Sequence, residues 1–175
     1  ASEGAEIVDV LNVTGIFEGG VLDAFASLVN VGAGSTSTDL NKIAGQDPDV
    51  NITVNDNSGT FAATDVVALG SKTSGTVTVS NAVVISGTQA EVTDALVHST
   101  KSVTAASALV TIGDNSGTLA ATDLSGIGAK TSGTVTVSNA ITISGSQAEV
   151  TDALVHATKS VTAASAVVTI GDSSG

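Results

Sequence analysis

The sequence predicts an α/β repeat protein, a β-rich, elongated, solenoid-like array of βα units of about 29 residues. One observation is that residues 71–117 recur as residues 129–175, with differences at only seven of 47 positions. A second is that Thr/Val stretches typical of strands alternate with stretches typical of capped helices. A third is that the chain has only three aromatic residues, so its core must consist of Val, Ile, Leu and Ala, which suits thin stacked layers.

The length of the unit follows from the isoleucine that ends each expected strand before a turn. The spacings between successive ones are 27, 31 and 27, so two units form one 58-residue repeat. They are Ile85, Ile112, Ile143 and Ile170. The chain is therefore divided into a divergent N-terminal unit or cap (1–36), first repeats (37–109), a second 58-residue repeat (110–167) and the start of a further repeat (168–175).

The N-terminal part departs from the repeat, as expected of a terminal cap. Apolar residues over 5–17 predict a strand, and helical spacing predicts a short helix over about 20–30. The resemblance to the repeat begins near residue 37. There Thr38 predicts a helix N-cap, and Gly45 and Pro48 predict the end of that helix.

The best-signalled helix of the repeat is SQAEVTDALVHATKS, residues 146–160. Ser146 and Glu149 form the pattern of a capping box, and Thr88 and Glu91 repeat it. We expect Lys159 to complement the helix dipole near the C-terminal end. Val150, Leu154 and Ala157 are expected on one face. The other helix, TDLSGIGAK, carries two glycines and is expected to be short.

The strands are predicted from alternation of β-branched residues. In the stretch TVTVS, Val135 and Val137 point to one face, and Thr134 and Thr136 point to the other. A helix between two strands is the crossover that parallel strands require, so parallel βαβ-like units are expected. The alternative is a row of small β-sandwich domains of about 58 residues, which the capped helices disfavour.

Charge and composition exclude several partners. The net charge is −12 and the pI about 4.1, and all five basic residues are lysines, so the chain repels the phosphates of nucleic acids and anionic lipids. No cysteine is present for disulfides or thiolate metal sites. No apolar run reaches the roughly 20 residues of a membrane span. We expect no nucleic acid partner and no membrane span.

Two sequence patterns resemble parts of known sites. The segment GDSSG at 171–175 is close to the nucleophile loop of serine proteases, with Ser174 as the candidate nucleophile, but a turn that leads into a helix, with Asp as its cap, explains it better. Asp56-x-Ser58 and Asp114-x-Ser116 are loosely similar to calcium loops. One carboxylate per turn is thin for calcium unless neighbouring turns pool theirs.

Other residues carry weaker signals. His98 and His156 are equivalent and each is alone on its expected helix, whereas a zinc site needs several ligands. Asn12 and Asn51 begin glycosylation sequons, which chance produces often in a Thr-rich chain. Rows of Thr resemble the flat arrays of ice-binding β-solenoids. No catalytic, cofactor-binding or metal-ligating residue is assigned, and calcium is kept as an alternative.

From residue 37 onward, TSGTVTVSNAITISG with SQAEVTDALVHA and TDLSGIGAKTSG resembles the repeat regions of giant secreted cell-surface proteins of marine cyanobacteria and related bacteria. These include surface proteins linked to swimming motility and adhesins exported by type I secretion. The resemblance implies an extracellular structural, adhesive or appendage role and carries over no catalytic residue. The glycine-rich calcium nonapeptides of such exported proteins are absent from this sequence.

The sequence thus predicts a non-enzymatic extracellular structural repeat protein, as a surface-layer, filament or adhesin-stalk segment. The alternative is a repeat module that binds carbohydrate, calcium or ice. Expected partners are further copies of the protein or further repeats of the same chain. Both ends look like cuts, so the chain is expected to be a processed or excerpted piece of a longer chain.

Overall fold

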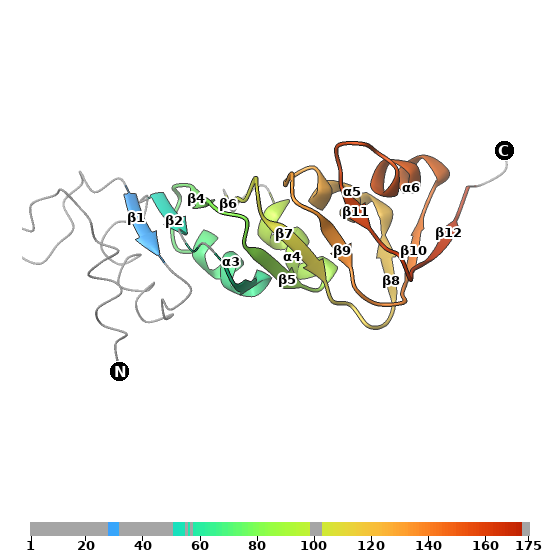
Figure 1. Ribbon diagram of the computed structural model, residues 1–175, viewed down its shortest axis with the longest axis horizontal. Coiled ribbons are helices and arrows are strands. Elements are labelled where there is room, and N and C mark those ends of the chain that lie inside the picture. The colour runs from blue at the N-terminus through green and yellow to red at the C-terminus, as the bar shows by residue number, and fades with distance from the viewer. Residues whose placement is uncertain (1–27, 32–50, 55, 57, 99–102, 173–175) are drawn as a thin grey trace, which may run out of the picture.

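The computed structural model describes residues 28–31, 51–54, 56, 58–98 and 103–172, and these form an α/β protein with parallel sheets and four helices. The elements follow one another along the long axis, from β1 and β2 to β12 (Figure 1). The helices are α3 (Ala63–Gly70), α4 (Gln89–Leu96), α5 (Ala121–Gly128) and α6 (Gln147–Leu154). The strands are β1 (Leu28–Val31), β2 (Asn51–Val54), β3 (Thr60–Ala62), β4 (Val77–Val79), β5 (Val84–Gly87), β6 (Val103–Thr104), β7 (Leu109–Ile112), β8 (Thr118–Ala120), β9 (Val135–Val137), β10 (Thr142–Gly145), β11 (Val161–Thr162) and β12 (Val167–Ile170).

The strands pair by a simple rule. Apart from β1 and β2, two strands that pair are always two places apart in the chain, as β2 and β4 are. The segment that connects the two paired strands contains one helix. The resulting orders are β1-β2-β4-β6, β11-β9-β7-β5-β3 and β12-β10-β8. Every ladder among the described strands is parallel, as the crossover helices require. The alternative of tandem sandwiches does not fit, because sandwiches are built from antiparallel sheets.

The register explains the 58-residue period. Ile52 pairs with Val77, and Val77 pairs with Val103, so the residue number rises by 25 or 26 at each step along this ladder. A further seven residues lead to Val110, the repeat equivalent of Ile52, which pairs with Val135. In that short stretch β7 follows β6 without a helix between them, and the two strands belong to different sheets.

The alternation predicted for the strands is confirmed. Val135 and Val137 are buried in β9, whereas Thr136 is exposed. The core consists of such Val and Ile side chains together with Leu, Ala and Phe61, and it runs through the whole described part from β2 to β11. Successive helices pack on one another as well as on the strands that precede them.

The capping boxes are also confirmed. The Thr88 hydroxyl accepts a hydrogen bond from Glu91 N, and the Glu91 carboxylate accepts one from Thr88 N at 2.8 Å. The same pair of bonds joins Ser146 and Glu149. The backbone donor of Thr88, followed by its side chain, lowers the pKa of Glu91.

The extent of the helices was partly mispredicted. Helix α6 ends at Leu154, so Ala157 is exposed beyond the helix rather than on its buried face, which Val150 and Ala153 form. Lys159 also lies beyond the last turn and does not complement the dipole as expected. The glycine-containing α5 is as long as α6, because burial of Leu124 and Ile127 outweighs the low helix propensity of glycine.

The expectations for the N-terminal part fare less well. The helix expected over 20–30 is wrong where it can be compared, because Leu28–Val31 form β1, paired in parallel with β2. Apolar spacing over so few residues does not distinguish a helix from a buried strand. The strand expected over 5–17 and the helix expected near Thr38 lie outside the described residues.

Candidate functional site

The polar residues that recur in each repeat mostly bond to the backbone of a neighbouring strand or turn. Thr131 is buried, and its hydroxyl donates to the carbonyl of Ala108 in the preceding unit. The same hydroxyl accepts from Gly133 N at 3.0 Å, and Ser132 donates from both N and Oγ to the carbonyl of Ala106. The TSG turn therefore clamps the loop before β7 against β9.

Asparagines make a second set of such links. The Asn139 amide donates to the carbonyl of Asp114 at 2.9 Å, and Asn81 bonds in the same way to the carbonyl of Asp56, also at 2.9 Å. Each bond joins residues one step of the ladder apart. The SNA turn thus satisfies a backbone carbonyl of the GDNSG or NDNSG turn beside it.

The aspartate of that turn caps a helix, as predicted, but a different one. Asp114 Oδ2 accepts a hydrogen bond from the backbone N of Gln89 at 2.6 Å, so it caps α4, which precedes it in the sequence. Asp172 makes the equivalent bond to Gln147 N, the first residue of α6, at 3.1 Å. An anion at a helix N-terminus is favourable because free N–H groups and the helix dipole both attract it.

Gln89 joins the same junction through its side chain. Its amide donates to the carbonyl of Ala120 at 2.9 Å, and its side-chain carbonyl accepts from Ala120 N at 3.1 Å. Ala120 ends the edge strand β8 and is the N-cap residue of α5, which has no side-chain cap. The side chain of Gln89 therefore forms the two backbone hydrogen bonds with Ala120 that a neighbouring strand would otherwise form. Sequence reasoning missed this bond, because nothing local relates Gln89 to a residue in the next unit.

A second network that the sequence did not reveal joins α5 and α6. Lys159 Nζ lies 2.6 Å from Asp152 Oδ2 and 2.7 Å from Ser125 Oγ, and Ser125 also donates to that carboxylate. The hydrogen bond from Lys159, followed by that from Ser125, holds the pKa of Asp152 below its ordinary value. Ser125 occupies the position that Val67 has in the first repeat. This difference between the repeats was the signal in the sequence that could have indicated the contact. Lys159 donates to both the Ser125 hydroxyl and the Asp152 carboxylate, so the three side chains form an ion pair bridged by a hydroxyl.

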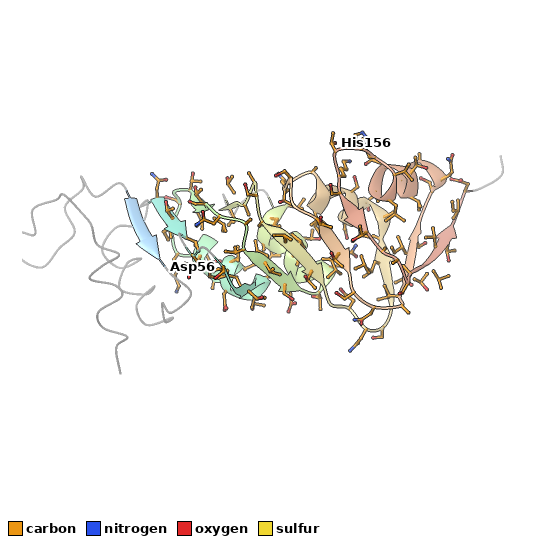
Figure 2. All side chains as sticks on the ribbon, viewed as in Figure 1. Asp56 and His156 are labelled. Carbon is orange, nitrogen blue, oxygen red and sulfur yellow. The ribbon has the colours of Figure 1, made fainter. Side chains whose placement is uncertain are left out.

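The described residues do not form a cluster of carboxylates that could bind calcium. Among the described residues, no group of three or more His, Cys, Asp or Glu side chains comes together around a point. Asp114 is engaged at the start of α4, and Ser116 is exposed. Asp56 lies near β2, at the opposite end of the described part from His156 (Figure 2). The pooling of carboxylates between turns that the calcium alternative requires is therefore not seen among the described residues.

The histidines lie beyond helices rather than on them. His156 follows α6 and is exposed, and its Nδ1 lies 3.1 Å from the hydroxyl of Thr158 (Figure 2). His98 occupies the equivalent place after α4, with its backbone N donating to the carbonyl of Thr93. Among the described residues, neither histidine belongs to a group of three or more His, Cys, Asp or Glu side chains.

The remaining candidates give little geometry. Ser174 and Asn12 lie outside the described residues. Asn51 begins β2, and its side-chain oxygen accepts a hydrogen bond from Thr76 N at 2.9 Å. It therefore has a structural role at the start of a ladder.

Threonines of successive strands do align in rows. Thr53, Thr78 and Thr104 are register partners in the sheet β1-β2-β4-β6. Thr111, Thr136 and Thr162 are register partners in the sheet β11-β9-β7-β5-β3. In the second row, Ser86 precedes Thr111, and the hydroxyls of Thr136 and Thr162 lie 3.5 Å apart. Parallel strands lie about 4.8 Å apart, so the rows present hydroxyls at regular intervals.

No family model, curated protein sequence or solved structure matches the chain. Within the described residues, no helix is both long enough and apolar enough to cross a membrane.

Proposed function

We propose that the protein is a non-enzymatic extracellular structural repeat protein, in which solenoid-like βα units form a spacer, stalk or filament segment at a cell surface. The observation that carries this proposal is the use of the recurring polar side chains. Thr131, Asn139, Asp114 and Gln89 bond to the backbone of a neighbouring unit instead of converging on a pocket. Residues used in this way set the spacing of units, which is the property that a spacer needs.

Composition supports the same proposal. A net charge of −12 favours solubility, and the near absence of aromatic side chains leaves few anchors for a tight ligand site. The resemblance of the repeats to those of giant bacterial surface proteins points to the same setting. Partners are then further repeats, in the same chain or in neighbouring copies.

The array is tested by inserting one more copy of residues 110–167 after residue 167. If units stack along one axis, two ladder steps add about 10 Å to the largest dimension measured by small-angle X-ray scattering. The matched control is a Gly/Ser insertion of the same length, which adds no helix by circular dichroism. An increase in the cross-section instead of the length contradicts the proposed architecture.

The location is tested separately on intact cells of the source organism. An antibody raised against the purified chain is expected to label intact cells, and external protease is expected to remove the label. Labelling that requires permeabilised cells contradicts an extracellular role. The outcome does not depend on how the units stack.

A second candidate function is binding through the threonine rows, and the register of Thr111, Thr136 and Thr162 favours it. Regularly spaced hydroxyls on a sheet can order water or form hydrogen bonds with a carbohydrate chain. The test is thermal hysteresis of the purified protein, compared with a Thr136→Val variant. A hysteresis gap that the variant loses supports ice binding, and equal freezing behaviour of both proteins and buffer contradicts it.

A further inference from the structure

The face formed by α6 and β12 is an unfilled copy of an internal junction. Inside the described part, the surface of α4 and β7 receives β8, α5 and β9. Residues of α6 and β12 are equivalent to those of α4 and β7 in the 58-residue repeat, but no described element covers them.

Burial shows the difference position by position. Val110 and Ile112 of β7 are 1% and 0% exposed, whereas their equivalents Val168 and Ile170 of β12 are 43% and 49% exposed. Val155 follows α6 and is 73% exposed. Its equivalent Val97 lies against α5, where a Cβ on Gly126 would be 3.6 Å from Val97 Cγ1.

The polar groups of the face match the same template. Gln89 is 7% exposed and forms two hydrogen bonds with the backbone of Ala120, whereas the equivalent Gln147 is exposed. In β7, Val110 N donates to the carbonyl of Thr134 in the next unit at 2.9 Å. The equivalent donor in β12 is Val168 N, on an edge strand of its sheet. An apolar edge strand of this kind is a template for pairing with another strand.

We propose that the α6–β12 face is a docking surface for a β–α–β unit with the sequence of Thr118–Val137, and that Gln147 sets its register. This inference rests on the proposed array of units. In the docked state, Gln147 bonds to the backbone at the N-cap of the incoming helix, and Val168 N pairs with the incoming second strand. The incoming helix covers the shallow groove on α6 that Gln147, Ala148, Thr151, Asp152, Val155 and His156 line.

The same template excludes the N-terminal end of an intact second copy. Its β3, α3 and β4 are equivalent to β8, α5 and β9, but the edge of β4 that β12 would use is already taken by β2. Because β2 is the repeat equivalent of β7 and β12, the two strands would compete for one position. The surface therefore selects a unit whose second strand has a free edge.

The test compares the 175-residue chain with a chain extended after Gly175 by a further copy of residues 118–175. Amide hydrogen exchange at Val168 is expected to slow by at least about tenfold in the extended chain. Gln147→Ala is the informative variant, because it is expected to leave the melting temperature of the 175-residue chain unchanged and to lower that of the extended chain. Gln89→Ala, at the internal junction, should lower the melting temperature of both.

Each alternative outcome overturns the inference. Unchanged exchange at Val168 in the extended chain means that the face does not receive the unit. An equal effect of Gln147→Ala in both chains means that Gln147 does not set the junction. Self-association of the 175-residue chain, with protection of Val168 that rises with concentration, means that an intact second copy is the occupant. These measurements use purified protein, so their failure is distinguishable from failure of the proposed cellular location.

Discussion

The carboxylate of Asp114 caps a helix that begins one unit before it in the sequence, accepting a hydrogen bond from Gln89 N at 2.6 Å. The helix start is thus stabilised twice, by the local capping box of Thr88 and by a turn from the next unit. A helix of two turns is marginal by itself, so these caps and the packing of its buried face must hold it.

Replacement of Asp114 by Asn is therefore expected to destabilise the protein. The side-chain oxygen of Asn can still accept from Gln89 N, but the bond is no longer charge-assisted and the charge at the helix N-terminus is lost, at an expected cost of about 0.3–1 kcal/mol. The free energy of unfolding from urea denaturation measures the effect. Asn115→Ser, the exchange that the repeat itself makes at position 173, is the control and should be neutral. Equal midpoints for Asp114→Asn and the unaltered protein would show that the inter-unit cap is dispensable.

Gly133 is required for a close approach of two backbones. A Cβ built at this position lies 2.2 Å from the carbonyl oxygen of Ala108, which cannot move without breaking its bond with Thr131. Gly133→Ala is expected to cost about 1–3 kcal/mol of folding free energy, the range found for overpacked sites. Gly171→Ala is the matched control, because a Cβ there meets no atom within 4 Å. Thermal unfolding of both variants should separate them clearly, and similar melting temperatures would contradict the steric account.

The strands were predictable because their signal is local. A β-branched residue at nearly every position, with Val and Thr in alternation, already determines both the extended conformation and the buried face, as Val135 and Val137 show. The capping box at Ser146 and Glu149 is equally local. The parallel arrangement followed from the helix between the strands.

The ends of the helices and the links between units were not predictable in the same way. Helix propensity continues past Leu154 in the sequence, but the chain turns there and leads to the contact of Lys159 with Ser125 and Asp152. The bond between Gln89 and Ala120 joins residues of different units, and its existence depends on the ladder register. Such tertiary contacts leave no periodic signal in one sequence.

Leu124 tests how far the thin core depends on single side chains. It is completely buried in α5. Leu124→Ala therefore removes apolar contacts and leaves a cavity, at an expected cost of about 2–5 kcal/mol. Val155→Ala, at an exposed position, is the control and should be nearly neutral, as surface substitutions usually are. Urea denaturation of both variants gives the comparison. A loss below about 1 kcal/mol at Leu124 would mean that neighbouring units close the cavity.

The carboxyl of Asp152 provides a prediction about pH. Its pKa in the folded protein lies below the ordinary value of 3.8, first because of the hydrogen bond from Lys159 and then because of that from Ser125. Because the pKa is lower in the folded protein, the ionised carboxyl of Asp152 stabilises the fold at pH values above the ordinary pKa. This stabilisation is lost as the pH falls through the pKa of the folded state. Asp152→Asn is therefore expected to lower stability at neutral pH, and the difference from the unaltered protein should shrink on acidification below pH 3.8.

The order of the two causes can be measured directly at the same carboxyl. NMR titration of the Asp152 side chain in the Lys159→Met and Ser125→Ala variants should show the pKa rising in both. The rise should be larger for Lys159→Met, because the ammonium contributes the larger hydrogen bond and a charge, whereas the hydroxyl contributes one neutral donor. High salt should reduce the effect of Lys159 more than that of Ser125, since the carboxylate side chain is partly exposed and the ion pair is screened. A larger shift for Ser125→Ala would mean that the buried hydroxyl, and not the ion pair, controls this link between α5 and α6.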